Sequence, residues 1–313
     1  MAERDRACGY RSAEFAASHA HEGRALELPQ SGGWLVRRAV PGDRGATDAI
    51  ACYPLLCCGD WGALPSDLAM LDDVVTVTAV VDPMAPVDEG VLRAAFPDLL
   101  RPYKEHQVVD LRTYELAAVS GHHRRNVARG HRRCRIERVD PPVEAGDDWV
   151  LLYDQLRARH GVTGRADLPD AALRQQLQAP GAVVHRADVD GVLAGIVVWM
   201  VSDGVAYYHL GAYSAAGYQD RAAYALFDVG LRELADLADV AVLGSSAGDE
   251  GAGEDDGLLR FKRGWGTFER TAHLAGRIVD AEAYERLAEG RGAGFFPAYR
   301  ASVPAVAASG ERS

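Results

Sequence analysis

Residues 182–214 have the sequence AVVHRADVDGVLAGIVVWMVSDGVAYYHLGAYS, in which three apolar runs are separated by two Asp-Gly pairs. Asp-Gly pairs favour tight hairpin turns, because both residues tolerate the positive φ that such turns need. The runs between them are rich in β-branched and aromatic residues, which is typical of strands. This stretch therefore predicts three consecutive antiparallel strands at 182–187, 192–201 and 205–213.

Helical patterns lie on both sides of these strands. One helix is expected to begin at Asp147 or Asp148 and to end before Gly161, and a longer one follows the third strand. The order helix, three antiparallel strands, helix, strand, loop, strand indicates an α+β fold and not the strict alternation of a doubly wound one. The predicted elements are helices 147–160 and 218–237 and strands 240–243 and 267–279.

The first half of the chain contains a similar mixture of strands and helices. The segment DPPVEAG at 140–146 interrupts both patterns and is the best candidate for a linker. Two related domains side by side are therefore expected: an N-terminal domain over 29–143 and a C-terminal domain over 144–280, flanked by an irregular segment (1–28) and an extension with a frayed tail (281–313). The predicted elements of the first half are strands 34–40, 74–81, 107–111 and 134–139 and helices 87–95 and 120–130.

Composition limits the class of protein. The chain has 313 residues, of which 48% are hydrophobic and 25% are charged, so wholesale disorder is excluded. The longest apolar run, 192–201, is too short to cross a bilayer, and no apolar segment follows the charged N-terminus. We therefore expect a cytoplasmic protein with no membrane span.

The charge is strongly acidic, with a net value of −11 at pH 7. Such a chain is a poor general binder of nucleic acid, so any polyanion must be bound by a local basic surface. Residues 122–135 provide one, with six arginines and three histidines, of which Arg124, Arg125 and Arg129 are candidates for binding phosphates. A solvated helix face that pairs with acidic residues elsewhere is the alternative. The spacing of the histidines does not fit a metal site, and no metal is predicted.

Only two of the 34 basic residues are lysines, Lys104 and Lys262. In an arginine-rich chain a retained lysine can mark a place where a compact ammonium is needed, although chance or solvent exposure is an equally good explanation. The five cysteines are odd in number and fit no C-x2-C pair, so reduced, buried thiols are expected. These cysteines are Cys8, Cys52, Cys57, Cys58 and Cys134.

Two short motifs could carry chemistry. Tyr207 and His209 lie at the end of a predicted strand that leads into a helix, where ligand oxygens often bind. A strand histidine is more often structural than catalytic. The second motif, GLLRFKRGWG at 257–266, follows an acidic loop and places two adjacent cations, Lys262 and Arg263, between aromatic residues. It predicts a compact cationic site with aromatic walls.

Four segments in this order resemble the Fem (FemABX) family of aminoacyl-tRNA-dependent peptidyltransferases. They are YYHLGAYS (207–214), Tyr224-Ala225-Leu226, VLGSS (242–246) and GLLRFKRGWG. The last is similar to the family element GL-x-x-FK-x-GFG, with Trp265 in place of Phe, and the basic segment resembles the family's Arg-rich helix. The resemblance covers about residues 100–280 and is weak over 1–90. The helical-hairpin arm of many members has no room between 147 and 181.

The resemblance implies an α+β fold of two tandem GNAT-like domains, the N-terminal one reduced. It also implies an acyltransferase that forms an amide bond by transferring an aminoacyl group from aminoacyl-tRNA to an amine, with no cofactor and no covalent enzyme intermediate. Lys262 matches the family lysine near the reacting ester and the terminal phosphates, so it is the first catalytic candidate. From their place at the strand end, His209 or Tyr207 could accept the amine's proton.

The acceptor is expected to be a peptidoglycan precursor or a natural-product amine. Arg37 or Arg38 could clamp the diphosphate of a peptidoglycan precursor. The other residues predicted to bind substrate are Arg263, Tyr213, Tyr224 and Trp265, and those predicted to bind tRNA are Arg124, Arg125 and Arg129.

Two other functions remain open. An acetyl-CoA-dependent GNAT N-acetyltransferase would need glycines that let backbone N–H groups approach a pyrophosphate, and residues 219–224, QDRAAY, lack them. A non-catalytic scaffold that binds tRNA or a phosphorylated metabolite through the basic segment is the second alternative.

Overall fold

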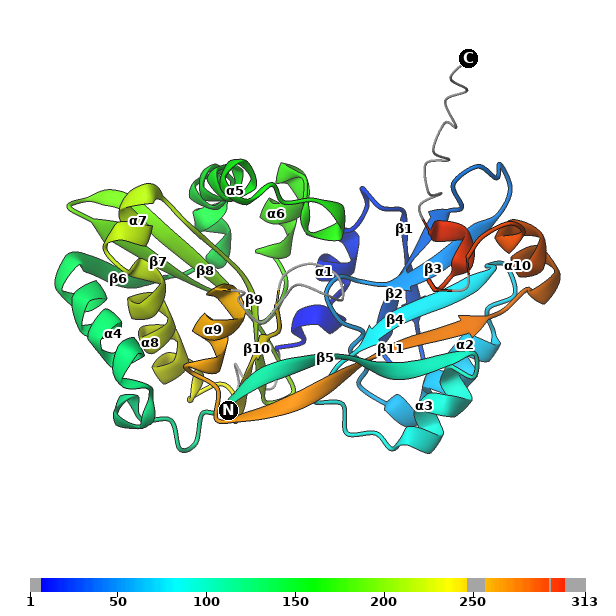
Figure 1. Ribbon diagram of the computed structural model, residues 1–313, viewed down its shortest axis with the longest axis horizontal. Helices are drawn as coiled ribbons and strands as arrows, with labels where there is room; N and C mark the ends of the chain where they lie inside the picture. Colours follow the sequence, from blue (N-terminus) through cyan, green and yellow to red (C-terminus); the bar gives the residue numbers. More distant parts are fainter. Residues whose placement is uncertain (1–6, 247–256, 293, 302–313) are drawn as a thin grey trace, which may run out of the picture.

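The computed structural model describes residues 7–246, 257–292 and 294–301. Within these residues, eleven strands form one sheet that runs along the molecule, in the order β1-β2-β3-β4-β11-β5-β10-β9-β8-β7-β6 (Figure 1). The strands are β1 (Arg24–Leu28), β2 (Gly33–Ala39), β3 (Thr47–Ala51), β4 (Thr76–Val81), β5 (Leu99–Asp110), β6 (Cys134–Val139), β7 (Ala182–Val189), β8 (Val192–Ser202), β9 (Val205–Tyr213), β10 (Val240–Gly244) and β11 (Phe268–Ile278).

Helices cover both faces of the sheet (Figure 1). Adjacent residues of β5 show the division, because Val108 packs with α1, α5 and α6, whereas Val109 packs with α4 and α8. Helices α2 and α3 pack on the N-terminal half of the sheet. The described helices are α1 (Ala13–Ala17), α2 (Leu64–Ala69), α3 (Glu89–Ala95), α4 (Gly121–Arg133), α5 (Gly146–His160), α6 (Asp170–Gln176), α7 (Ala215–Gln219), α8 (Ala222–Leu234), α9 (Gly257–Arg263) and α10 (Ala281–Ala288).

The centre of the sheet interlocks the two halves of the chain. Strand β5, from the first half, lies between β10 and β11, which both come from the second half. Strand β11 in turn pairs with β4 of the first half. Each half therefore completes its hydrogen bonding only with a strand from the other.

Strands β9 and β10 run parallel, joined through α8, and they separate early. Their pairing covers Val205–Tyr207 of β9 and Val240–Val242 of β10 only. Strand β9 continues to Tyr213, and β10 turns away at Gly244, where it pairs with β5 after an irregularity. The sheet is thus open between Tyr208 and the loop that follows Gly244.

Several predicted elements are present. The three-stranded meander forms β7, β8 and β9, and β6 has the predicted bounds. Helix α5 ends at Gly161, which has the left-handed φ of 60° that its position requires. All five cysteines are free thiols, and all but Cys8 are buried.

Other elements differ from the prediction. The helix expected over 218–237 is divided into α7 and α8 at Arg221, whose φ is 65°. Strand β5 begins at Leu99, well before the predicted strand 107–111. The N-terminal segment expected to be irregular contains α1 and β1, and Phe15 of α1 is fully buried. The extension at 281–313 contains α10; its predicted frayed tail lies mostly outside the described residues.

Strand pairing crosses the predicted domain boundaries. Strand β6, assigned to the 29–143 domain, pairs along its whole length with β7. Helix α4 packs against α8, and β11 joins the N-terminal half of the sheet. The division at 143/144 therefore stays a prediction, and hydrogen bonds do not follow it.

Candidate functional site

Lys262 lies near the end of α9, with only 6% of its surface exposed. Its Nζ donates to the carbonyl oxygen of Ser245 at 2.6 Å and lies 5.5 Å from the centroid of the Tyr208 ring. Gly244 has a φ of 79°, and a Cβ there would lie 3.2 Å from Nζ, so glycine lets the backbone approach the charge. The ammonium is held where β9 and β10 separate.

The other lysine of the sequence lies at the same loop. Lys104, in β5, donates from Nζ to the carbonyl oxygen of Ser246 at 3.4 Å. The two lysines therefore come from distant parts of the chain and donate to carbonyl groups of consecutive residues. The rarity of lysine singles out both residues in the sequence, but no local pattern indicates that they meet.

His106 accompanies Lys104 on the same face of β5, because the two are separated by one residue in a strand. Burial first, and then the charges of Lys262 and Lys104, lower the pKa of His106 to about 3, so its ring is neutral at physiological pH. Its Nδ1 is buried and has no hydrogen-bond partner among the described residues. His106 was not among the predicted site residues, and its two-residue spacing from a rare lysine is the signal in the sequence that could have identified it.

The aromatic residues beside Lys262 form a packed core. Trp265 is 2% exposed, and Phe261 lies edge-on to Phe227 with ring centroids 4.7 Å apart. His123 of α4 donates from Nε2 to the Phe261 carbonyl oxygen at 2.8 Å. A Cβ at Gly264 would lie 1.9 Å from the Cε1 atom of His123, so only glycine allows this contact. The predicted aromatic wall therefore faces the protein interior and fixes α9 against α4.

The remaining predicted substrate residues divide into two groups. The Tyr213 side chain interacts with that of Tyr208, whose ring lies beside Lys262. Tyr224 packs edge-on against Phe261, with ring centroids 5.0 Å apart, and is half-buried at the junction of α4, α8 and α9. Arg263 is exposed. Tyr213 is thus connected to Lys262 through Tyr208, and Tyr224 supports the helix that carries Lys262.

His209 has both ring nitrogens engaged. Its Nε2 donates to the Gln176 side-chain oxygen at 3.0 Å, and its Nδ1 accepts from the Tyr10 hydroxyl at 3.1 Å. Burial lowers the pKa of His209 to about 3. Because neither nitrogen is left to accept an amine proton, the geometry does not support the predicted catalytic role, and it makes His209 a hydrogen-bonded core residue.

Tyr207 is committed to a buried carboxyl group. Its hydroxyl donates to Asp82, which follows β4, at 2.6 Å, and Asp82 also accepts from the Met84 backbone N–H at 2.9 Å. Burial raises the pKa of Asp82 to about 6 and that of Tyr207 well above its usual value. Tyr207 is therefore a poor proton acceptor at neutral pH. The pair joins β9 to the N-terminal half of the sheet.

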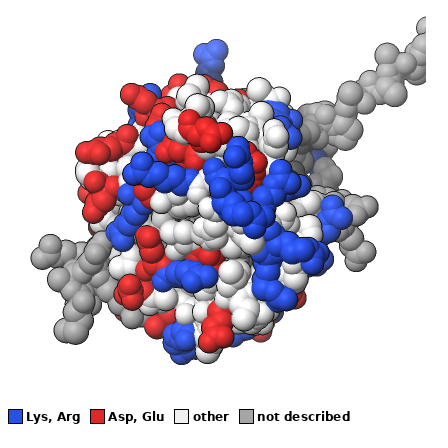
Figure 2. All heavy atoms as spheres, turned by 90° about the vertical axis from the view of Figure 1, so that its left-hand side faces the viewer, with Lys and Arg blue, Asp and Glu red and all other residues white. Residues whose placement is uncertain are grey.

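The basic segment forms α4 and the start of β6, at the end of the molecule that faces the viewer in Figure 2, where Lys and Arg side chains form a band interrupted by acidic ones. Arg124 is exposed, but its Nη1 donates to the carbonyl groups of Ala117 and Val119. Arg129 lies 3.8 Å from a carboxylate oxygen of Asp220. Arg125 is exposed and has no ion-pair partner among the described residues. Arg125 is therefore the most available of the three predicted phosphate-binding arginines.

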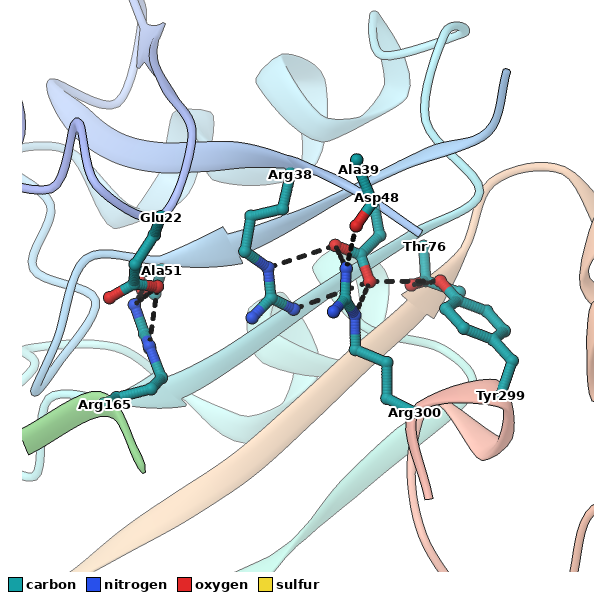
Figure 3. Close-up of polar contacts among 9 residues, drawn as sticks. All are labelled: Glu22, Arg38, Ala39, Asp48, Ala51, Thr76, Arg165, Tyr299 and Arg300. Atoms are coloured by element: carbon teal, nitrogen blue, oxygen red, sulfur yellow. Dashed lines mark hydrogen bonds and ion pairs between the residues drawn. The ribbon is translucent and has the colours of Figure 1, made fainter. Parts of the chain in front are cut away.

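Arg37 and Arg38 have partners inside the protein. Arg38 donates to Asp48 at 3.2 Å, and Arg300 from the C-terminal segment donates to the same carboxylate, which is 1% exposed (Figure 3). Arg37 donates to Asp73 at 2.6 Å. Arg38 thus neutralises a buried carboxylate, and its predicted role in clamping a diphosphate has no support in this geometry.

The described residues contain neither a metal-binding cluster nor a helix that could cross a membrane. No group of three or more His, Cys, Asp or Glu side chains there is arranged to hold a metal ion. No helix in the same residues combines the length and apolar composition needed to cross a membrane.

Comparisons with known proteins agree with this architecture. Residues 121–263 match the family model of an acetyltransferase (GNAT) domain. The crystal structure of FemX superimposes with a TM-score of 0.65 at 14% identity and covers 91% of this chain and 96% of its own. The C-terminal domain of a putative lysylphosphatidylglycerol synthetase from Agrobacterium fabrum has a TM-score of 0.57 at 18% identity, over 90% and 92% of the two chains. The structure of L-PGS from Bacillus licheniformis has a TM-score of 0.56 at 14% identity, over 88% and 94%. A search of curated proteins finds no match.

These matches confirm the predicted α+β GNAT-type fold and its resemblance to the Fem proteins. The match of residues 121–263 to a GNAT domain supports the predicted class of enzyme, a transferase. That domain begins at α4 and ends at α9, so it contains both the basic helix and Lys262.

Proposed function

We propose that the protein forms an amide bond by transferring an aminoacyl group from aminoacyl-tRNA to an amine acceptor. The observation that carries this proposal is the buried Lys262 ammonium, fixed by Ser245 and Tyr208 where β9 and β10 separate. Attack of an amine on an ester produces a tetrahedral oxyanion, and a preorganised cation beside that oxygen stabilises it. No cofactor is required, because the ester of aminoacyl-tRNA is already activated.

The basic face of α4 supports a polyanionic donor. Arg125 and Arg132 are exposed in an otherwise acidic protein, on the helix that contacts α9 through His123. Phosphates of a tRNA acceptor stem bound along α4 would therefore lie next to the element that carries Lys262. Arginine suits such contacts, because its planar fork binds phosphate oxygens in pairs.

The start of α8 disfavours acetyl-CoA, the alternative donor. Asp220 lies two residues before the first residue of this helix, is 8% exposed, and lies 3.5 Å from Arg133. Its carboxylate would repel a pyrophosphate at the helix N-terminus. Gly130 of α4 also packs here, since a Cβ on it would lie 2.8 Å from the Arg221 carbonyl oxygen.

Donor binding tests the proposal. The full chain is titrated with a charged tRNA pool and with acetyl-CoA at one fixed salt concentration, because phosphate contacts are screened by salt. We expect saturable binding of charged tRNA that weakens in Arg125→Ala. The matched control is Arg93→Ala, whose ion pair with Glu89 lies on α3. Micromolar binding of acetyl-CoA with no preference for tRNA would replace this proposal with an N-acetyltransferase.

The acceptor is identified by aminoacyl transfer to a panel of amines. A peptidoglycan precursor and small natural-product amines are the two predicted classes. The name of one structural neighbour, a putative lysylphosphatidylglycerol synthetase, adds phosphatidylglycerol to the panel. Incorporation of a labelled amino acid into one class, dependent on Lys262, would complete the assignment.

A further inference from the structure

Lys104 and Lys262 bring two positive charges to one loop. Lys104 belongs to β5 and Lys262 to α9, and they donate to the carbonyl oxygens of Ser246 and Ser245, respectively. Figure 1 shows β5 beside β10, at the end of which this loop begins. An anion bound at this loop would interact favourably with both ammonium groups.

The register of β5 directs Lys104 to this place. Lys104 pairs with Ala272 of β11, and the register shifts immediately afterwards, so that Pro102 pairs with His273. The register passes from Lys104 to Pro102 across Tyr103. Bulges of this kind often re-aim a side chain near a functional site. Lys104 and His106 follow the shift and, as residues i and i+2 of the strand, project from the same face of β5.

His106, beside these lysines, has a buried ring nitrogen that no described residue satisfies. Its side chain is 9% exposed, and its Nδ1 atom is buried without a hydrogen-bond partner among the described residues. A buried imidazole nitrogen left without a partner is unfavourable in the unliganded protein, and a ligand hydroxyl or phosphate oxygen would satisfy it. Because both lysines perturb this ring electrostatically, it lies within the same charged cluster.

We propose that Lys104 and His106 form, together with Lys262, a subsite for one phosphate group of the acyl donor. The N-terminal half of the chain thereby supplies part of the donor site. Lysine binds phosphate as a compact point charge, whereas arginine binds it through a planar guanidinium fork. The inference rests on the proposed transferase function for the identity of the donor, but the phosphate subsite itself does not require tRNA.

The test uses phosphate-bearing probes and the full chain. Binding of inorganic pyrophosphate and of the trinucleotide CCA, the sequence that ends every tRNA, is measured by calorimetry at constant ionic strength, with adenosine as the probe without phosphate. We expect both phosphate probes to bind at least 10-fold more weakly to Lys104→Gln than to the wild type. Lys104→Arg should restore only part of the affinity, and His106→Phe should weaken binding while its melting temperature shows that it is folded.

Two controls test whether the loss of binding is specific to Lys104 and to phosphate. Arg93→Gln removes an exposed charge on α3 and should leave probe binding within two-fold of the wild type. Adenosine should not distinguish the wild type from Lys104→Gln. Pyrophosphate binding alone would indicate a free phosphate or a nucleotide as the ligand, whereas binding of CCA would indicate the end of tRNA.

Equal affinity of Lys104→Gln and the wild type, or no binding of either phosphate probe to the wild type, would overturn the subsite. Aminoacyl transfer is measured separately. Lys104-dependent probe binding without transfer from charged tRNA would leave the subsite and remove the proposed function. Transfer from charged tRNA, combined with probe binding that does not depend on Lys104, would support the proposed function and overturn the subsite.

Discussion

At the level of single residues, Lys262 offers the clearest test of the proposed chemistry. Replacing it with alanine removes the ammonium between Ser245 and Tyr208, and turnover should fall about 100-fold or more if that charge faces the oxyanion. Lys262→Arg should not restore wild-type turnover, because a planar guanidinium does not fit a place shaped for a point charge. Steady-state kinetics with charged tRNA measure the effect; turnover near that of the wild type would remove the residue from the mechanism.

The lowered pKa of the buried His209 ring makes the free energy of unfolding depend on pH. Its pKa of about 3 in the folded protein lies below the ordinary value of 6.5, so the native state binds fewer protons than the unfolded chain between these values. Stability is therefore lost as the pH falls below 6.5, by about 2 kcal/mol between pH 6.5 and pH 5 from this group alone.

The variant His209→Gln isolates this contribution. Glutamine keeps a donor for Gln176 and an acceptor for Tyr10 but does not titrate. Urea unfolding at pH 7 and pH 5 should show the wild type losing about 2 kcal/mol more than the variant over this interval. Parallel losses in the two proteins would mean that His209 is not buried as a neutral ring.

Part of the candidate site could be predicted from residue types alone. The FK-x-G element drew attention to Lys262, and the scarcity of lysine drew attention to Lys104, but no local pattern joined them. A polar side chain at a strand end, such as His209, resembles a site residue until its partners, here Tyr10 and Gln176, are known. Those partners come from segments far away in the sequence.

At the level of elements, the contact between α9 and α4 depends on one glycine. Gly264→Ala would place a Cβ 1.9 Å from His123 and displace its ring from the Phe261 carbonyl group. We expect a loss of about 1–3 kcal/mol in the free energy of unfolding. Activity should also fall, because Lys262 lies only two residues earlier on α9.

Gly121→Ala is the matched control. It lies in the first turn of α4, where an added Cβ meets only ordinary contacts, 3.6 Å from the nearest side-chain atom. Alanine is the better helix former, so this variant should be as stable as the wild type or slightly more so. Thermal unfolding compares the two; equal melting temperatures for both variants would contradict the tight contact at His123.

Elements fixed by local signals were predictable, and those fixed by distant partners were not. The Asp-Gly turns specified β7, β8 and β9, and Gly161 specified the end of α5. The first part of β5 was missed because its pattern is polar and its partner, β11, lies far along the chain. The break at Arg221 was missed because a positive φ at a non-glycine residue leaves no mark in the sequence.

At the level of the whole molecule, the interlocked sheet predicts that the C-terminal half cannot fold alone. A fragment of residues 121–280 contains β10 and β11 but lacks β5, which lies between them, and β4, which pairs with the other edge of β11. Its strands would expose unpaired backbone groups and should aggregate.

Co-expression with a fragment of residues 1–120 should restore a soluble complex, because it supplies both missing strands. Near-UV circular dichroism and gel filtration distinguish the outcomes. A monomeric 121–280 fragment with cooperative unfolding would show that the strand exchange is not needed for folding.

The position of β5 also has a consequence for synthesis on the ribosome. Strand β5 is complete at Asp110, but β10 begins only at Val240, and β11 ends at Ile278. At ordinary translation speeds the backbone groups on both edges of β5 therefore stay without a partner strand for on the order of ten seconds, until β10 or β11 has been synthesised. Nascent chains stalled in this interval should therefore recruit chaperones, whereas the finished protein, with both edges covered, should not.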